Sequence, residues 1–435
     1  MKKETLLLLF CLFLSVNIPF CTAQETKLTL TVEQARQYAV EHNRSLKNAA
    51  LEVKKAQSDR WQTISTMLPQ VDGSFDYQNY CGYEAILNMQ GIAVPIAMNP
   101  NATMSVKSYI ALSGQQIVGS MLKTLAIDMA KLSGQEGDQN IKNQVTNVYM
   151  SVLVMEKVVT LLDSNLANIQ NLQKITENAV AAGAAEETDA DQLRVQAAQF
   201  RNTINATKRN LEMSYNSLRL LLGCQVNTEL VLTENVENLL NVADAEQLLN
   251  ATFNMQNNYN YQKLQKSIEI SDKQVWLAAV EYFPTISLFH SYSFKTYFGK
   301  NAGMNMSPPN LVGVSINMPI WSSGTRATKV RSAMINREIV KNTMADMEAQ
   351  LSIQDRQLRY NLASAVENYN LQKENIEVSQ RVFESMSRKF KYGTASSMDI
   401  NQASNNLISA QNNYVQSMLS MLNAQIALEA LLNNK

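Results

Sequence analysis

The amino-acid sequence contains one pattern twice, and this internal repeat restricts the possible folds more than any other feature. An early segment, LTVEQARQYAVEHNRSLKNAALEVKKA, is followed by a break at Leu68-Pro69 and then by VDGSFDYQNY. A later segment, ADAEQLLNATFNMQNNYNYQKLQKSIEI, leads to Phe283-Pro284 and TISLFHSYSF. A second correspondence, AAGAAEETDADQ with KYGTASSMDINQ, sets Gly183 against Gly393 and Asp189 against Asp399. A period of about half the chain predicts two copies of one structural unit.

Long helices account for most of each repeat. Apolar residues step alternately by three and four, an average of about 3.5 that is typical of coiled coils. One such series is Val32, Ala35, Ala39, His42, Leu46, Ala49, Val53 and Ala56, and others run from Ile141 to Ile169 and from Leu351 to Phe390. A helix over residues 139–182 would be on the order of 65 Å long, at about 1.5 Å per residue. Such a length exceeds an ordinary globular core, so we predict coiled-coil helices.

Segments with a period of two lie between these helices. The apolar residues of the last one alternate with Gly313, Ser315, Asn317 and Pro319, and they are Val312, Val314, Ile316, Met318 and Ile320. This pattern predicts strands at residues 69–80, 105–117, 284–297 and 310–321. In a soluble sheet the apolar face would cover a core, whereas in an outer-membrane barrel it would contact lipid. We favour lipid contact because aromatic residues cluster at the strand ends, as at Tyr77, Tyr80, Tyr83, Phe283, Tyr292, Tyr297, Phe298 and Trp321.

The strand count has a consequence for assembly. Four strands cannot close a barrel, since about eight is the practical minimum. Unpaired strand edges are not tolerated in lipid, so several copies of the chain must pool their strands. The two loops that join the paired strands, residues 81–104 and 300–309, are rich in Gly, Pro, Asn and Met and are expected at the exposed rim.

The N-terminus has the pattern of a secretory signal peptide, predicted to span residues 1–23. Lys2 and Lys3 precede an apolar run, and the small-residue exit Cys21-Thr22-Ala23 follows. Cys21 is also a candidate lipid acceptor, although the residues before it lack the small side chains that such a site needs. The first repeat is then residues 24–222, an inter-repeat linker covers residues 223–245, and the second repeat is residues 246–435.

Composition excludes several classes of function. The chain has 38 basic and 38 acidic residues, so its charge gives no reason to expect nucleic acid as a partner. His42 and His290 are its two histidines, and Cys81 and Cys224 remain after processing; none of these shows metal-ligand spacing. We expect no metal and no cofactor. No nucleophile elbow or phosphate loop is present in the sequence, so we do not expect an enzyme.

From about Leu28 to Leu432, the chain resembles the TolC-like outer-membrane efflux family. The resemblance rests on the repeat order and on the segments MLPQVDGSFDY, EYFPTISLFHSY, VGVSINMPIWSSGTR and FKYGTASSMDINQASNNLISAQ. It implies a mixed α and β membrane protein: a homotrimer in which four strands per chain form one twelve-stranded outer-membrane β-barrel. A long α-helical coiled-coil tunnel would continue this barrel into the periplasm, and the linker would form a waist.

The resemblance also implies partners and site residues. Family members are passive exit ducts, joined to an inner-membrane transporter by a periplasmic adaptor protein. By position, the adaptor-docking hairpin tips are residues 183–189 and 393–399, with Gly183, Ala184, Asp189, Gly393, Thr394 and Asp399 as the contact residues. Alternatively these residues only form the turns, because Gly permits a left-handed helix end and Asp or Thr caps the next helix.

Glu384 aligns near an acidic position that constricts the tunnel in some relatives, where threefold symmetry would form a ring of carboxylates. The alternative is a solvated surface glutamate whose charge Arg388, Lys389 and Lys391 neutralise.

Two rival functions remain at the level of sequence. A non-pore coiled-coil envelope scaffold, anchored at the outer membrane, explains the helices but not the paired period-two segments. A periplasmic hydrolase lacks any supporting motif.

The cargo of a duct could be small toxic molecules or a secreted polypeptide. The first-repeat strand exit, YIALSGQQIVGSMLK, is less apolar than its second-repeat counterpart, which leaves its lipid-facing register open.

Overall fold

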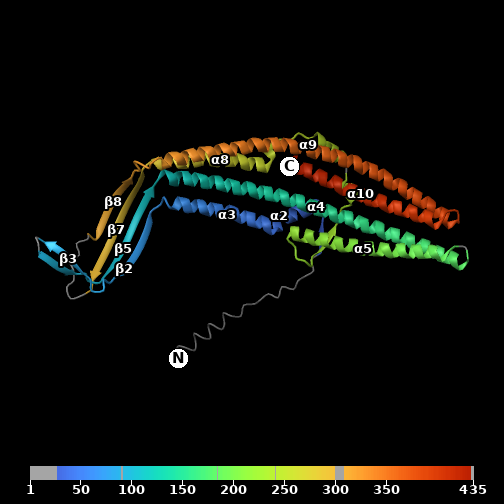
Figure 1. The fold of residues 1–435 in the computed structure, drawn as a ribbon, viewed down its shortest axis with the longest axis horizontal. Helices are drawn as coiled ribbons and strands as arrows, with labels where there is room; N and C mark the ends of the chain where they lie inside the picture. The colour runs from blue at the N-terminus through green and yellow to red at the C-terminus, as the bar shows by residue number, and fades with distance from the viewer. Residues whose placement is uncertain (1–26, 90–91, 184, 241, 299–307, 433–435) are drawn as a thin grey trace, which may run out of the picture. The chain divides into compact units, whose positions relative to one another are not determined.

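The computed structural model describes residues 27–89, 92–183, 185–240, 242–298 and 308–432 (Figure 1). The chain divides into two compact units. One comprises residues up to Ala39 together with Val148–Leu239, and the other comprises Val40–Asn147 and residues from Leu240 onward. The predicted signal peptide and Cys21 lie outside the described residues.

The first unit contains one helical hairpin. The second part of α4 (Gly114–Ala181) turns back into α5 (Glu187–Leu222), and their facing stripes bury large apolar side chains. These include Val152, Leu162, Ile169, Leu193, Phe200, Ile204 and Leu218. The same unit holds β1 (Lys27–Leu30), most of α2 (Val32–His42), β6 (Glu229–Leu232) and α6 (Val236–Leu239).

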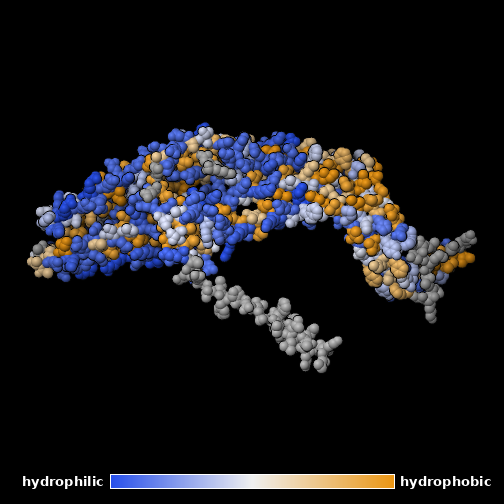
Figure 2. All heavy atoms as spheres, turned by 180° about the vertical axis from the view of Figure 1, so that it is seen from behind, coloured by the Kyte–Doolittle hydropathy of each residue, from blue (hydrophilic) through white to orange (hydrophobic). Residues whose placement is uncertain are grey.

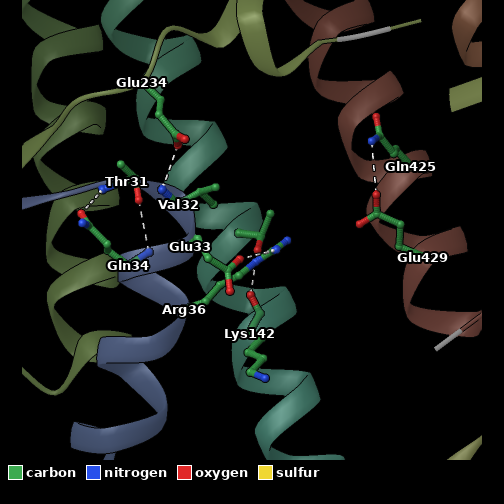
Figure 3. A network of polar contacts seen from close by, with 10 residues as sticks. Thr31, Val32, Glu33, Gln34, Arg36, Lys142, Glu234, Gln425 and Glu429 are labelled. Carbon is green, nitrogen blue, oxygen red and sulfur yellow. Dashed lines mark hydrogen bonds and ion pairs between the residues drawn. The ribbon is translucent and has the colours of Figure 1, made fainter. Parts of the chain in front are cut away.

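A parallel strand pair and a capped helix tie the first unit together. β1 pairs in parallel with β6, in the register Lys27↔Glu229 to Leu30↔Leu232. The buried hydroxyl of Tyr149 donates to the Leu30 carbonyl at 2.9 Å. Figure 3 shows the start of α2, where Thr31 and Gln34 bond reciprocally and the Val32 amide donates to the Glu234 carboxylate at 2.8 Å. These bonds satisfy amides that a helix leaves unpaired at its N-terminus.

The second unit contains the sheet and the second helical hairpin. Its helices are α3 (Arg44–Ser65), the first part of α4, α7 (Val242–Asn250), α8 (Tyr259–Ala279), α9 (Thr325–Lys391) and α10 (Ser397–Leu432), with 3-10 turns at Met255–Asn257 and Val280–Tyr282. α9 packs along α10, and the buried apolar residues of these two helices include Leu351, Leu362, Tyr369, Phe383, Ile400, Leu407 and Met421. The rings of Tyr369 and Tyr414 stack between the two helices with centroids 5.6 Å apart.

One four-stranded antiparallel sheet follows the order β2-β5-β7-β8. Its strands are β2 (Gln70–Gln78), β5 (Asn101–Leu112), β7 (Thr285–Tyr297) and β8 (Asn310–Asn317). β2 and β8 are the edges, and each has one side without a strand partner among the described residues. Each repeat therefore supplies two neighbouring strands and one long helical hairpin, as the internal repeat predicts.

Two strand predictions were wrong at their ends. The strand expected at residues 105–117 is β5, which begins at Asn101 and ends at Leu112. Its successor Ser113 caps α4, because the Ser113 amide donates to Gln116 Oε1 at 3.0 Å and the Gln116 amide donates to Ser113 Oγ at 3.3 Å. The strand expected at residues 310–321 ends at Asn317, so Met318 and Ile320 lie beyond β8.

The interior of the first rim segment was also mispredicted. Residues 81–104 were expected to form a loop, but they contain a two-stranded antiparallel sheet of β3 (Glu84–Met89) and β4 (Ile92–Ala97), and β5 has already begun by residue 104. Of the second rim segment, residues 300–307 lie outside the described residues.

The first apolar helical series is interrupted. Asn43 has an extended backbone between α2 and α3, and its side-chain oxygen accepts hydrogen bonds from the Ser45 and Leu46 amides at 2.8 and 3.4 Å. The series from Val32 to Ala56 is thus shared by two helices rather than one.

Among the described residues, α4 alone is long and apolar enough to cross a membrane by length and composition. The most apolar part of α4 is 44% buried inside the protein. A helix that packs against other helices also needs apolar residues. The length and hydropathy of α4 are therefore weak evidence for a membrane span.

Candidate channel wall and hairpin tips

The register of the four-stranded sheet separates apolar from polar side chains. Partners in an antiparallel pair lie on the same face. Because Leu288 pairs with both Ile110 and Val314, these three residues share one face. The large apolar side chains of this face are Val71, Phe75, Tyr77, Met104, Val106, Ile110, Leu112, Ile286, Leu288, Tyr292, Phe294, Val312, Val314 and Ile316.

The part of the chain that the structure describes leaves this apolar face uncovered. Phe75 is 72% exposed, Phe294 is 59% exposed and Val314 is 65% exposed. Figure 2 shows hydrophobic residues gathered over this region of the second unit. A monomeric soluble protein rarely exposes so large a contiguous apolar surface, which marks it as a contact surface for lipid or protein.

The opposite face is mainly polar. Ser74 and Ser105 are neighbours on it, with their hydroxyl oxygens 2.8 Å apart, and Lys107 and Asp72 pair across the same two strands. Ser287, Ser291 and Ser293 continue this face on β7. The sheet therefore has the two-sided character of a wall between an apolar phase and water.

The residues predicted to face lipid along the last strand divide into two groups. Val312, Val314 and Ile316 lie in β8 on the apolar face, whereas Met318 and Ile320 are exposed in the segment that follows. That segment is held by Arg326, whose Nη1 donates to the Pro319 carbonyl at 2.9 Å and whose guanidinium lies 5.6 Å from the centre of the Tyr282 ring. Beside it, the Lys329 ammonium pairs with the Glu281 carboxylate at 2.8 Å.

At the tip between α9 and α10, hydrogen bonds cap both the end of α9 and the start of α10. Gly393 has a left-handed backbone with φ of 71°, and its amide donates to the Phe390 carbonyl at 3.0 Å. The Thr394 amide and hydroxyl both donate to the Lys389 carbonyl, at 2.9 and 3.0 Å. On the other side of the turn, the Ser396 amide donates to the Asp399 carboxylate at 2.9 Å. The hydrogen bonds from Ser396, followed by the charge of Lys389, lower the pKa of the Asp399 carboxyl below its ordinary value.

The tip between α4 and α5 is simpler. Gly183 has φ of 72°, and its amide donates to the Val180 carbonyl at 2.9 Å. Glu186 occupies the cap position of α5, and its carboxylate accepts a hydrogen bond from the Thr188 hydroxyl at 3.2 Å but makes no capping bond to a backbone amide. Asp189 lies in the first turn of α5, where a negative charge favours the helix dipole. Ala184 lies outside the described residues.

Of the predicted tip residues, Gly183 and Asp189 belong to the first unit, and Gly393, Thr394 and Asp399 belong to the second. Glu384 is an exposed residue of α9 that accepts a hydrogen bond from Gln380 Nε2 at 2.8 Å. Within the described residues, no group of three or more His, Cys, Asp or Glu side chains is placed to hold a metal ion.

Arg359 is an organising residue that sequence reasoning missed. Its Nε donates to Asp355 at 2.9 Å within α9, and its Nη2 donates to the Ala251 carbonyl at 2.7 Å. Nη1 also donates to the carbonyls of Leu248 and Leu249. One guanidinium thus satisfies carbonyls at the C-terminal end of α7 and fastens α7 to α9.

Comparison with known proteins agrees with this architecture. The sequence model of the outer membrane efflux protein family matches residues 35–224 and 255–434. The toluene efflux pump outer membrane protein TtgC of Pseudomonas putida is 22% identical over 416 residues, which cover 91% of this chain and 81% of that protein.

Solved structures share the fold at lower identity. CusC superposes with a TM-score of 0.74 at 16% identity, over 92% of this chain and 91% of that one. VceC from Vibrio cholerae superposes with a TM-score of 0.72 at 13% identity, over 93% of this chain and 96% of that one. At these identities the likeness concerns the fold, which the present chain has over nearly its whole length.

Proposed function

Because the chain belongs to the outer membrane efflux protein family, we propose that it forms the outer-membrane exit channel of a tripartite export system. Three copies place four strands each in one closed barrel, and their helices enclose a periplasmic tunnel. Substrates pass through this duct passively, since the energy is supplied by an inner-membrane transporter. The chain itself performs no enzymatic step.

One observation carries this proposal: the four-stranded sheet has a continuous apolar face, a polar face and two edges that no other described strand pairs with. In lipid every backbone amide and carbonyl must find a partner within the protein. β2 of one copy and β8 of the next are the edges that closure would join. The rival function is a coiled-coil scaffold without a pore. It does not explain the exposed apolar face of this sheet.

The hairpin tips are the proposed docking sites for a periplasmic adaptor. Gly183 and Asp189 form one site and Gly393, Thr394 and Asp399 form the other, while Ala184 belongs to the first by sequence. Their turns end long helices and are held by backbone hydrogen bonds, which supports a role as defined contact points. Glu384, exposed on α9 near the second tip, is the proposed acidic constriction of the tunnel.

Accessibility along β8 tests the channel wall. Single cysteines are introduced at residues 312–317, in a chain whose Cys81 and Cys224 are replaced by serine. Positions 312, 314 and 316 should resist a water-soluble maleimide in intact membranes and react with a lipid-soluble one. Positions 313, 315 and 317 should react with the water-soluble maleimide and resist the lipid-soluble one. Uniform reactivity with the water-soluble reagent would exclude a lipid-embedded wall and favour the scaffold.

A further inference from the structure

An apolar patch interrupts the polar face of the four-stranded sheet. Tyr109 on β5 pairs with Phe289 on β7, and Phe289 pairs with Gly313 on β8, so two aromatic residues are neighbours in one row across the sheet. Leu311 is the next residue of β8 on this face. Tyr109 is 42% exposed and Leu311 is 51% exposed, whereas Phe289 is half-buried. Tyr109, Phe289 and Leu311 together form the inner apolar patch.

Gly313 determines how the Phe289 ring lies. A Cβ atom built on Gly313 would be 2.5 Å from Cζ of Phe289 and 2.9 Å from its Cε1, well inside van der Waals contact. The far end of the ring therefore rests on the Gly313 backbone, on the side of β7 away from Tyr109. A ring that covers a glycine of an edge strand stabilises a sheet. This contact explains Phe289, but it does not explain the exposed side chains of Tyr109 and Leu311.

The charges nearest to the inner apolar patch have opposite signs. Lys107 is the neighbour of Tyr109 along β5 on this face, and it pairs in register with Asp72 of β2. The neighbours of the patch along β7 are two serines, Ser287 and Ser291. The patch thus offers ring and aliphatic surface beside one positive and one negative charge. Such a surface suits a ligand that has an aromatic ring and no net charge.

Neither lipid nor another copy would cover this patch in the proposed barrel. Lipid contacts the opposite, apolar face of the same sheet. A barrel of about eight strands has an interior that its own side chains fill, and wider barrels leave room inside. Three copies of the four-stranded sheet give twelve strands, so the patches of different copies are kept apart by the lumen. The patch therefore faces the water through which substrates would pass.

We propose that the inner apolar patch is a weak binding site, on the export route, for small molecules that carry an aromatic ring and no net charge. This inference rests on the proposed channel function. The ring of such a molecule stacks in an offset arrangement on Tyr109 or meets the edge of Phe289, and Leu311 extends the apolar surface. Threefold symmetry repeats the site around the lumen. Weak binding suits a duct, because a substrate must be able both to enter and to leave.

Protection from cysteine labelling tests this site. Ser291→Cys places a thiol beside the patch, in a chain whose Cys81 and Cys224 are replaced by serine. Its rate of reaction with a water-soluble maleimide is measured in outer membranes at neutral pH. The probes are L-phenylalanine and L-cyclohexylalanine, two zwitterions of similar size that differ in aromaticity. L-Phenylalanine should slow labelling at a concentration roughly two- to tenfold lower than L-cyclohexylalanine.

Aromatic substitutions in the same background assign the effect to the patch. Phe289→Leu and Tyr109→Leu should each remove the preference for the aromatic probe. Phe294→Leu, the matched control, removes a ring from the opposite face of the same strand and should keep the preference. Because Phe289→Leu also loses the contact with Gly313, the Tyr109 variant decides the outcome if the Phe289 variant does not assemble.

Two results would overturn the inference. One is equal protection by the two probes in the Ser291→Cys protein, and the other is a preference that survives both Phe289→Leu and Tyr109→Leu. The labelling rate without a probe distinguishes this inference from the proposed function. A thiol at position 291 that reacts but shows no ring preference contradicts the aromatic site alone. A thiol that does not react with the water-soluble reagent contradicts the water-lined wall, and with it the proposed function.

Discussion

Ser396 and Asp399 cap the first turn of α10 reciprocally. The Ser396 amide donates to the Asp399 carboxylate at 2.9 Å, and the Asp399 amide donates to the Ser396 hydroxyl oxygen at 3.2 Å. The corresponding position at the other tip is Glu186, which makes no such bond to α5. The two repeats therefore stabilise equivalent turns by different means, and this difference leads to the first prediction.

Ser396→Ala should loosen the start of α10. Loss of a serine cap typically costs about 1 kcal/mol, so amides 397–400 should exchange with solvent roughly fivefold faster. Hydrogen exchange followed by mass spectrometry measures this. Glu186→Ser is the converse variant, because it recreates the Ser-x-x-Asp pattern with Asp189 and should slow exchange in the first turn of α5. Unchanged exchange in both variants would contradict the capping argument.

The same cap should depend on pH. The folded-state pKa of Asp399 lies below the ordinary value of 3.8, so its stabilisation is fully present above that pH. It disappears as the pH falls through the lower folded value. Exchange at the start of α10, corrected for intrinsic rates, should accelerate in that acidic window, and Asp399→Asn should remove the pH dependence.

Bulkier residues at the tip glycines should disturb the tips specifically. A side chain at Gly183 or Gly393 meets no heavy atom within 4 Å, but the left-handed backbone costs an L-residue about 1–2 kcal/mol. Replacing both by valine should abolish export while trimers remain in the membrane. Gly134→Ala is the matched control, since that helical glycine also has open space around it and lacks a positive φ. Normal export by the double variant would refute docking at the tips.

A charge on the apolar face of β8 should impair membrane insertion. Val314→Lys places an ammonium where lipid is expected, at a cost of about 2–4 kcal/mol near the membrane centre. Ser315→Lys, on the adjacent polar face, should be tolerated. The fraction of trimer recovered from purified outer membranes measures both. Equal recovery of the two variants would argue against the assigned lipid-facing register.

Arg359→Ala should weaken the attachment of α7 to α9. The guanidinium bonds to Asp355 and to carbonyls at the end of α7, and losing a charged hydrogen-bonding group of this kind costs about 1.5–3 kcal/mol. Thermal unfolding should shift to lower temperature, and the amides of Val242–Asn250 should lose protection. Arg356→Ala, at an exposed position one turn earlier on α9, should leave both unchanged. A destabilisation common to both variants would show a general effect of charge.

The repeat and the periodicity predicted most of the architecture because they are local and strongly patterned. Alternation from Val312 to Ile316 specified a strand and its two faces, and helical spacing specified the helices that bury Val152 and Leu362. The glycines of both tips were also predictable, since Gly183 and Gly393 end long apolar series. The structure adds the left-handed backbone that makes them necessary.

The features that were missed depend on contacts distant in sequence or on competition between local signals. Arg359 contacts carbonyls more than a hundred residues earlier, and the Lys27–Leu30 segment gains its strand only by pairing with Glu229–Leu232. The end of β5 did have a local signal, because Ser113-Gly-Gln-Gln116 is a helix-capping sequence. Apolar residues that continue beyond Leu112 concealed it. The same correction resolves the first-repeat register, since QQIVGSMLK belongs to α4 rather than to a strand.

The central claim, that copies of this chain form one conducting duct, is tested most directly by single-channel recording of the purified native oligomer in a planar lipid bilayer. The mass of the same preparation should be determined in parallel. The account predicts trimer-sized particles that insert and conduct ions. A monomer that neither inserts nor conducts would contradict it and would favour a coiled-coil scaffold at the outer membrane.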